Sequence, residues 1–374
     1  MTIHSSKDYR SSAVGHVIRE HRKARGLTQK QLAGSLGVEA RTLRMYENGE
    51  RVLENISDLR RIADLLEIDP VELGLAASKH TISTTTQVQE MIERVAMLIP
   101  QARFVEARAT VDTFFRNLKK RQPGNEDPVF LRALAQAHCL AGQVQAITRR
   151  TRDVEHMLYH FQEMVQLAQL VDDQTLLNLA LSQQGDMQRR RGEGVQAIFS
   201  LEQARECTPL ADAVARGNNA LLLGRAYAGN ADYEGFEREM AHAEEIAHTI
   251  PPMAAPLTLY SPGSVYEEYA SNYARMGKLE KSRHYLQLAE KYLPTNTLWD
   301  MLLKATRAEV QVYSGEITQA MPLLIEVAHL AQMYGHQRLI ERLYRLQYYL
   351  DDQSSLMRQA SRSLGEILHG PVER

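Results

Sequence analysis

The chain has 374 residues, which is enough for one small and one larger domain, each with its own hydrophobic core. Its 24% of charged and 44% of apolar residues are ordinary for a soluble protein, and a formal net charge of −2 gives the whole molecule no bias toward a polyanionic partner. Two cysteines form neither a disulfide framework nor a zinc-binding spacing, and no stretch suits a signal peptide or a transmembrane helix, so we expect a cytoplasmic protein without membrane contact.

Almost every segment has the 3.6-residue apolar period of a helix, and none alternates as a strand does, so the sequence predicts an all-α protein. A polar segment rich in Ser and Thr indicates a linker at 77–87, between an N-terminal domain at 1–76 and a C-terminal domain at 88–374. Five short helices are expected in the N-terminal domain: Val14–Arg25, Thr28–Leu36, Glu39–Asn48, Ser57–Leu66 and Pro70–Gly74.

The segment 27–51, LTQKQLAGSLGVEARTLRMYENGER, carries the most specific motif of the sequence. Thr28 is placed to cap a helix, Ala33 lets two helices cross closely, and Gly37 suits a left-handed turn at the helix end. From the N-terminus to the end of this segment, ten basic residues stand against five acidic ones. The pattern resembles the helix-turn-helix of the Cro/cI (Xre) regulators over residues 14–75, and this resemblance implies sequence-specific binding to double-stranded DNA.

The third helix of this motif is the expected recognition helix. At 100° per residue, four of its side chains fall on one outward arc from which they can reach base edges: Ala40, Arg41, Arg44 and Met45. The resemblance implies that four further side chains contact phosphates: Gln29, Thr42, Asn48 and Arg51. It also implies an ion pair between Arg22 and Glu47. Two alternatives stay open, because the arginines of such a helix can be merely solvated and some domains of this kind bind only proteins.

After the linker the expected helices are longer and come in pairs, and one spacing of small and apolar residues recurs. Steps of 12, 4 and 3 residues separate the members of three sets: Gly185, Ala197, Leu201 and Ala204; Gly224, Phe236, Met240 and Ala243; Ala270, Ser282, Leu286 and Ala289. The pattern resembles the tetratricopeptide repeat over residues 176–334, with a generic helical bundle as the alternative. The expected fold is therefore a five-helix Cro/cI-type domain followed by a superhelical array of tetratricopeptide-like hairpins.

Such an array exposes a concave groove, lined mainly by the first helix of each pair. Counting from the repeat glycines, eight residues are expected on this surface as candidate peptide contacts: Asn178, Ser182, Asp186, Arg189, Asn218, Arg225, Glu267 and Ser271. The two asparagines have alternative roles, since Asn218 can cap a helix and Asn178 can simply be exposed. The proline-containing segment 248–263 is expected to be either a lid over the groove or an ordinary surface loop.

The two-domain order resembles the peptide-pheromone-responsive regulators grouped as RRNPP, which implies an oligopeptide ligand and a homodimer. We find no phosphate loop, no nucleophile elbow and no zinc motif, so we expect neither an enzyme nor a cofactor. His156 and His160 have a spacing that can bind metal, but no third ligand is apparent. Two alternatives are kept: a DNA-binding regulator whose repeats dock a partner protein, and a protein-interaction inhibitor that does not bind DNA.

Overall fold

The structure, a computed structural model, describes residues 5–51, 53, 56–68, 72–73, 82, 84–118, 127–151, 154–251 and 257–369. Seventeen helices are assigned within these residues. None of the helices described is both long and apolar enough to cross a bilayer. The predicted helix Pro70–Gly74 falls largely outside the described residues, and Glu72 and Leu73 form a turn.

Four helices form the N-terminal domain: α1 Ser5–Ala24, α2 Gln29–Leu36, α3 Ala40–Glu47 and α4 Ile56–Leu66. Thr28 caps α2 through a capping box with Gln31, and Gly37 ends this helix with a φ of 70°, as expected of a residue without a side chain. Ala33 is buried in the domain core. The local chemistry of segment 27–51 therefore determines where α2 begins and ends.

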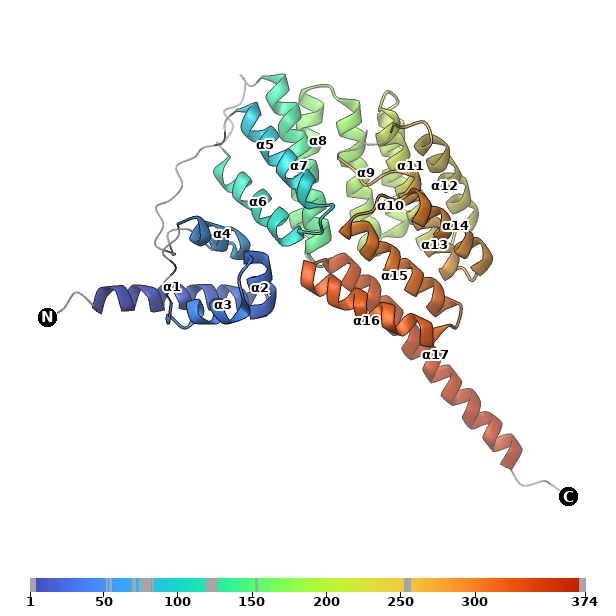
Figure 1. Ribbon diagram of the computed structural model, residues 1–374. Helices are drawn as coiled ribbons and strands as arrows, with labels where there is room; N and C mark the ends of the chain where they lie inside the picture. The colour runs from blue at the N-terminus through green and yellow to red at the C-terminus, as the bar shows by residue number, and fades with distance from the viewer. Residues whose placement is uncertain are drawn as a thin grey trace.

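Thirteen further helices follow: α5 Thr85–Leu98, α6 Phe104–Asn117, α7 Pro128–Thr148, α8 Val154–Leu170, α9 Gln174–Arg190, α10 Gly194–Cys207, α11 Ala213–Gly229, α12 Tyr233–Ala247, α13 Pro262–Arg275, α14 Leu279–Tyr292, α15 Thr297–Tyr313, α16 Ile317–Tyr334 and α17 Gln337–His369. They stack as antiparallel pairs into a curved array (Figure 1). Helix α5 begins at Thr85, so the last residues of the predicted linker form its first turn.

The recurring small residues lie where the two helices of a pair cross. A Cβ on Gly185 of α9 would lie 2.7 Å from the Leu201 side chain of α10, and one on Gly224 of α11 would lie 2.9 Å from Met240 of α12. In the next pair the Ser282 hydroxyl donates to the Ala270 carbonyl at 2.7 Å. Close helix approach thus explains the 12-residue step of the repeat.

The array closes on itself, whereas the sequence predicted an open groove. The backbone N–H of Leu298, in the first turn of α15, donates to the carbonyl of Pro100 after α5 at 3.1 Å. The ring of His336, before α17, packs edge-on against Phe104 of α6. Leu339 of α17 joins the core formed by α5, α6 and α7. The last helices therefore cover the first ones, and the concave side of the array becomes a partly open cavity.

The N-terminal domain is held against the repeats by ion pairs and hydrogen bonds. Glu67, after α4, contacts Arg25 of the N-terminal domain and Arg108 of α6, each at 2.6 Å. The Thr113 hydroxyl of α6 donates to Asp64 of α4 at 2.7 Å. Although burial disfavours its charge, the two arginines hold the pKa of Glu67 well below its usual range. Contacts with α6 therefore hold the N-terminal domain in position.

Asp112 of α6 lies beside this contact and gives the protein a testable pH dependence. Burial, followed by the nearby Glu67 carboxylate, raises the pKa of Asp112 to about 6. A carboxyl whose folded pKa exceeds its unfolded value takes up a proton on folding, so stability falls as pH rises from about 4 to about 6. We expect Asp112→Asn to increase the free energy of unfolding at pH 8 by at most about 2 kcal/mol and to have little effect near pH 4.5.

Thermal unfolding of the full chain at the two pH values measures this difference. The exposed Asp58→Asn on α4 is the matched control and is expected to leave both melting temperatures unchanged. A lower stability of Asp112→Asn at pH 8 would show that the contact of Asp112 with Arg108, at 3.5 Å, outweighs the repulsion from Glu67.

Candidate DNA-binding surface and ligand cavity

A buried ion pair positions α3, the predicted recognition helix. Arg22 of α1 donates from Nε to Glu47 Oε1 at 2.5 Å and from Nη2 to Oε2 at 3.0 Å. The Nη1 group of Arg22 donates to the carbonyl of Leu27, just before α2, at 2.7 Å. Gln29 Nε2 also donates to Glu47 Oε2, at 2.8 Å. These bonds join the end of α3 to α1 and to the start of α2.

The predicted base-reading face of α3 is open to solvent with the repeat domain in place. Ala40, Arg41 and Arg44 are exposed, and Met45 is half-buried. The Nε of Arg44 donates to Gln29 Oε1 at 3.4 Å. A long, weak bond of this kind can be exchanged for a base edge without leaving a buried group unpaired. Arg41 and Arg44 are therefore exposed and free of strong hydrogen bonds within the described structure, as a contact with DNA would require.

The residues predicted to contact phosphates flank this face but have different surroundings. Thr42 is half-buried, whereas Asn48 and Arg51 are exposed. Asn48 donates to the Glu50 carboxylate at 2.9 Å, and the Arg51 guanidinium lies over the ring of Tyr46. Gln29 uses its amide nitrogen on buried Glu47, so its side chain positions α3 as well as facing the surface.

We expect Arg41→Ala and Arg44→Ala each to weaken binding to the specific DNA site by about 1–3 kcal/mol, because a bidentate arginine–guanine contact is lost. Binding to unrelated DNA should weaken much less. Fluorescence anisotropy with specific and scrambled duplexes at one salt concentration measures both losses. Lys30→Ala, at an exposed position of α2, is the matched control for removal of one positive charge. Equal losses on both duplexes would assign the arginines to phosphates.

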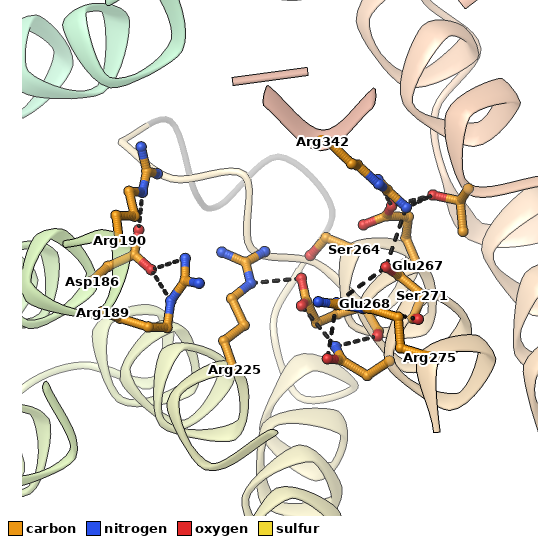
Figure 2. Close-up of polar contacts among 12 residues, drawn as sticks. Asp186, Arg189, Arg190, Arg225, Ser264, Glu267, Glu268, Ser271, Arg275 and Arg342 are labelled. Carbon is orange, nitrogen blue, oxygen red and sulfur yellow. Dashed lines mark hydrogen bonds and ion pairs between the residues drawn. The ribbon is translucent and has the colours of Figure 1, made fainter. Parts of the chain in front are cut away.

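The partly open cavity of the repeat domain has a volume of about 470 Å³. Side chains of α9, α11, α13, α15 and α17 line it, and its charged groups are mostly paired (Figure 2). On the α9 side, Asp186 contacts Arg189 at 2.7 Å and Arg190 at 2.8 Å. Burial works against the Asp186 charge, but the two arginines hold its pKa well below the usual range. Arg225 of α11 contacts Glu268 of α13 at 2.6 Å.

On the opposite side, Arg342 of α17 joins two neighbouring helices. It contacts Glu267 of α13 at 3.0 Å and also Glu309 of α15. Its Nη2 donates to the hydroxyls of Ser271 at 3.2 Å and Thr306 at 2.8 Å. Helix α17 is therefore fastened to the cavity wall by an ion pair network that the sequence did not predict.

Six of the eight predicted groove residues line the cavity: Asp186, Arg189, Asn218, Arg225, Glu267 and Ser271. The other two need a correction, because Asn178 and Ser182 are buried between helices and do not line it. Asn178 donates to the Thr208 hydroxyl at 2.8 Å, and Asn219 donates to the Ser182 hydroxyl at 2.8 Å. The spacing from the repeat glycines predicts a groove position for this face of α9, but the face packs against α10 and α11.

Asn218 of α11 is the clearest unsatisfied group in the cavity wall. It is only 5% exposed, and its Nδ2 has no hydrogen-bond acceptor among the described residues. An amide nitrogen buried without an acceptor costs about 1–3 kcal/mol. A ligand carbonyl in the cavity would remove this cost, so Asn218 is a candidate ligand contact.

Part of the segment 248–263 forms a wall of the cavity. Thr258, Leu259 and Tyr260 line it, whereas residues 252–256 lie outside the described part of the chain. The hydroxyl of Tyr260 donates to the Ala243 carbonyl, and its ring occupies the space beside Gly217, where a Cβ would lie 2.1 Å from Tyr260 Oη. The end of the segment is thus anchored on α11 and α12 and covers the cavity at that point.

Sequence reasoning missed the contribution of α17. Arg338, Arg342 and Arg345 recur at steps of four and three residues and all line the cavity. That helical spacing was a signal in the sequence, but only the closure of the array brings α17 to α13 and α15. The predicted His156–His160 pair falls partly outside the description, because the His156 side chain is not described, and His160 Nδ1 lies 3.1 Å from His138 Nδ1.

Residues 13–76 match a protein family described as "Helix-turn-helix domain". Over 82 residues the chain is 33% identical to the HTH-type transcriptional regulator RghRB of Bacillus subtilis strain 168, a match that covers 22% of this chain and 58% of RghRB. The chain thus spans a little over half the length of this relative.

Two solved structures are similar to the chain. One is a Rap protein complexed with competence and sporulation factor, with a TM-score of 0.50 and 15% identity, covering 93% of this chain and 99% of that one. The other is PlcR of Bacillus thuringiensis with the peptide PapR7 and DNA, with a TM-score of 0.37 and 17% identity, covering 75% and 96%. The helices, the domain match and the likeness to Rap confirm the predicted fold, a helix-turn-helix domain followed by tetratricopeptide-like hairpins.

Proposed function

We propose that the protein is a transcription regulator that binds DNA through α3 and is controlled by an oligopeptide in the cavity of its repeat domain. The observation that carries this proposal is the pairing of two features in one chain. Arg41 and Arg44 are exposed on the recognition helix, and a cavity of about 470 Å³ with an unsatisfied amide at Asn218 lies in the repeats. A structure with a similar fold, that of a Rap protein, was solved in complex with competence and sporulation factor.

The walls of the cavity suit a peptide. Its volume lies within the range of small-ligand sites, so it has room for a short peptide segment. Asn218 can donate to a backbone carbonyl, and Trp299 and Leu302 provide apolar surface for a side chain. Asp186, Arg225 and Glu267 offer charges of both signs from three helices. These contacts bind a backbone and discriminate among side chains.

Control of DNA binding requires that the peptide favour one arrangement of the two domains. The N-terminal domain rests on α6 and also touches α16, where Gln31 donates to the carbonyl of Gln332 at 3.1 Å. Helices α15 and α17, which line the cavity, lie beside α16 in the array (Figure 1). A peptide that shifts these helices would change the position of the N-terminal domain on the repeats.

We further propose a homodimer formed through the C-terminal end of the array. Met321 and Ile325 of α16 and Tyr348 and Met357 of α17 are large apolar side chains that are exposed. The end of α17 projects away from the array (Figure 1). A symmetric dimer would cover such surface and set the distance between two recognition helices.

The test begins with the full-length protein purified from its native host, from which bound peptides are eluted and sequenced by mass spectrometry. Each peptide is then titrated by calorimetry while operator affinity and molar mass are measured in parallel. We expect a peptide to bind and to change operator affinity, and Asn218→Ala to weaken peptide binding. A peptide that binds without changing operator affinity would contradict the control mechanism. Recovery of a stoichiometric partner protein instead of peptides would favour a docking role for the repeats.

A further inference from the structure

The cavity contains more positive than negative charge. Seven arginines and five carboxylates line it, and the one histidine in its wall adds no charge. Burial, followed by the neighbouring Arg338, lowers the pKa of this residue, His336, to about 3, so it is neutral at physiological pH. Several of these arginines are only partly exposed, and like charges held close together in one wall repel one another unless an anion offsets them.

The surplus is concentrated where α9, α11 and α17 meet. Two carboxylates of the wall are already paired, because Asp186 binds both Arg189 and Arg190, and Glu268 binds Arg225 (Figure 2). Three arginines of α9 and α11 therefore share two carboxylates, and α17 adds a further arginine to the same wall.

Arg338 is that additional arginine. It lines the cavity one helical turn before Arg342, and it makes no ion pair or hydrogen bond with any residue that the structure describes. Burial first, and then the charges of Arg190 and Arg225, lower the pKa of Arg338 well below its usual range. The position is thus unfavourable for a cation without a counter-charge. An unfavourable electrostatic environment of this kind at the wall of a cavity is typical of a residue that binds a ligand.

We infer that Arg338 is the docking point for a carboxylate of the ligand, which is its C-terminal group or an acidic side chain. This inference rests on the proposed peptide-binding function and adds the chemical class of the peptide. A planar guanidinium binds a carboxylate through two parallel N–H donors, and the nearby Arg190 and Arg225 strengthen the attraction. Asn218 precedes Arg225 by two turns on α11, so an amide for the ligand backbone and a guanidinium for its carboxylate line one cavity.

The first experiment compares three pools of synthetic heptapeptides bound to the full chain. One pool has free C-termini and no Asp or Glu, one is C-terminally amidated with a single Glu, and one is amidated with Gln in place of this Glu. Bound peptides are separated by gel filtration and quantified by mass spectrometry. We expect one or both carboxylate pools to be retained at least about tenfold more than the neutral pool. Retention of the first pool would identify the C-terminal carboxylate as the bound group, and retention of the second would identify the side-chain carboxylate.

The preference should disappear in Arg338→Gln and persist in Arg358→Gln, which removes an exposed arginine from the same helix. Equal retention of all three pools would overturn the carboxylate assignment while leaving peptide binding in place. Retention of no pool would argue against peptide binding itself.

A second measurement tests the carboxylate site without any peptide. Glutarate is titrated at constant ionic strength while the melting temperature of the full chain is followed. We expect the melting temperature to rise in the wild type and in Arg358→Gln but not in Arg338→Gln. Without glutarate, Arg338→Gln should melt at a higher temperature than the wild type, because the substitution removes the repulsion from Arg190 and Arg225. A lower melting temperature of this variant, or an unchanged response to glutarate, would overturn the inference.

Discussion

Replacement of Glu47 by alanine is expected to destabilise the N-terminal domain by about 3–5 kcal/mol, because Arg22 is left buried without a counter-charge. Arg22 and Glu47 are 8% and 4% exposed, and two hydrogen bonds of 2.5 and 3.0 Å join them. Gln29 would lose its acceptor as well. Hydrogen–deuterium exchange of the full chain measures this loss as faster exchange in α1 and α3, with little change in the repeats.

Glu50→Ala is the matched control, because Glu50 is exposed, three residues along the chain, and bonded only to Asn48 in the described structure. It should leave exchange in α1 unchanged. The pair Arg22→Met with Glu47→Leu should recover much of the lost stability, since apolar side chains of similar volume can replace a buried ion pair. Unchanged exchange in Glu47→Ala would show that the pair does not hold α3.

Local chemistry made the N-terminal domain predictable. The cap at Thr28 and the turn glycine Gly37 act within a few residues and have their predicted roles in the structure, and the small Ala33 is buried in the domain core. The Arg22–Glu47 pair spans 25 residues and was expected only from the resemblance to Cro/cI regulators. The helix α1 extends further than predicted and starts at Ser5, because the apolar period alone did not mark its beginning.

The cavity was only partly predictable, because its walls depend on distant contacts. The repeat spacing located Asn218 and Arg225 on α11 correctly with respect to the cavity. It failed for Asn178, whose face of α9 packs on α10, since turn counting does not say which neighbour covers a helix. The sequence of α17 alone does not indicate that Arg338 and Arg342 line the cavity beside α13 and α15, because their position depends on closure of the whole array.

Replacement of Arg342 by alanine is the second substitution with a large expected effect, about 3–5 kcal/mol of unfolding free energy at pH 7. Glu267 and Glu309 would remain buried, and α17 would lose its ties to α13 and α15. Thermal unfolding can be followed through the fluorescence of Trp299, the single tryptophan of the chain, which lines the same cavity. Arg358→Ala, at an exposed position of α17, should leave the transition unchanged.

The loss should also depend on pH with a definite sign. Burial disfavours the charge of Glu309, but Arg342 lowers its pKa below the ordinary value. A depressed folded pKa stabilises the protein above the unfolded pKa, and this contribution disappears as pH falls through the folded value. In Arg342→Ala the carboxyl loses its partner and can protonate, so the difference from the wild type should shrink between pH 7 and about pH 4. A difference that stays constant over this range would mean that lost packing of the arginine stem, and not the buried charge, destabilises the variant.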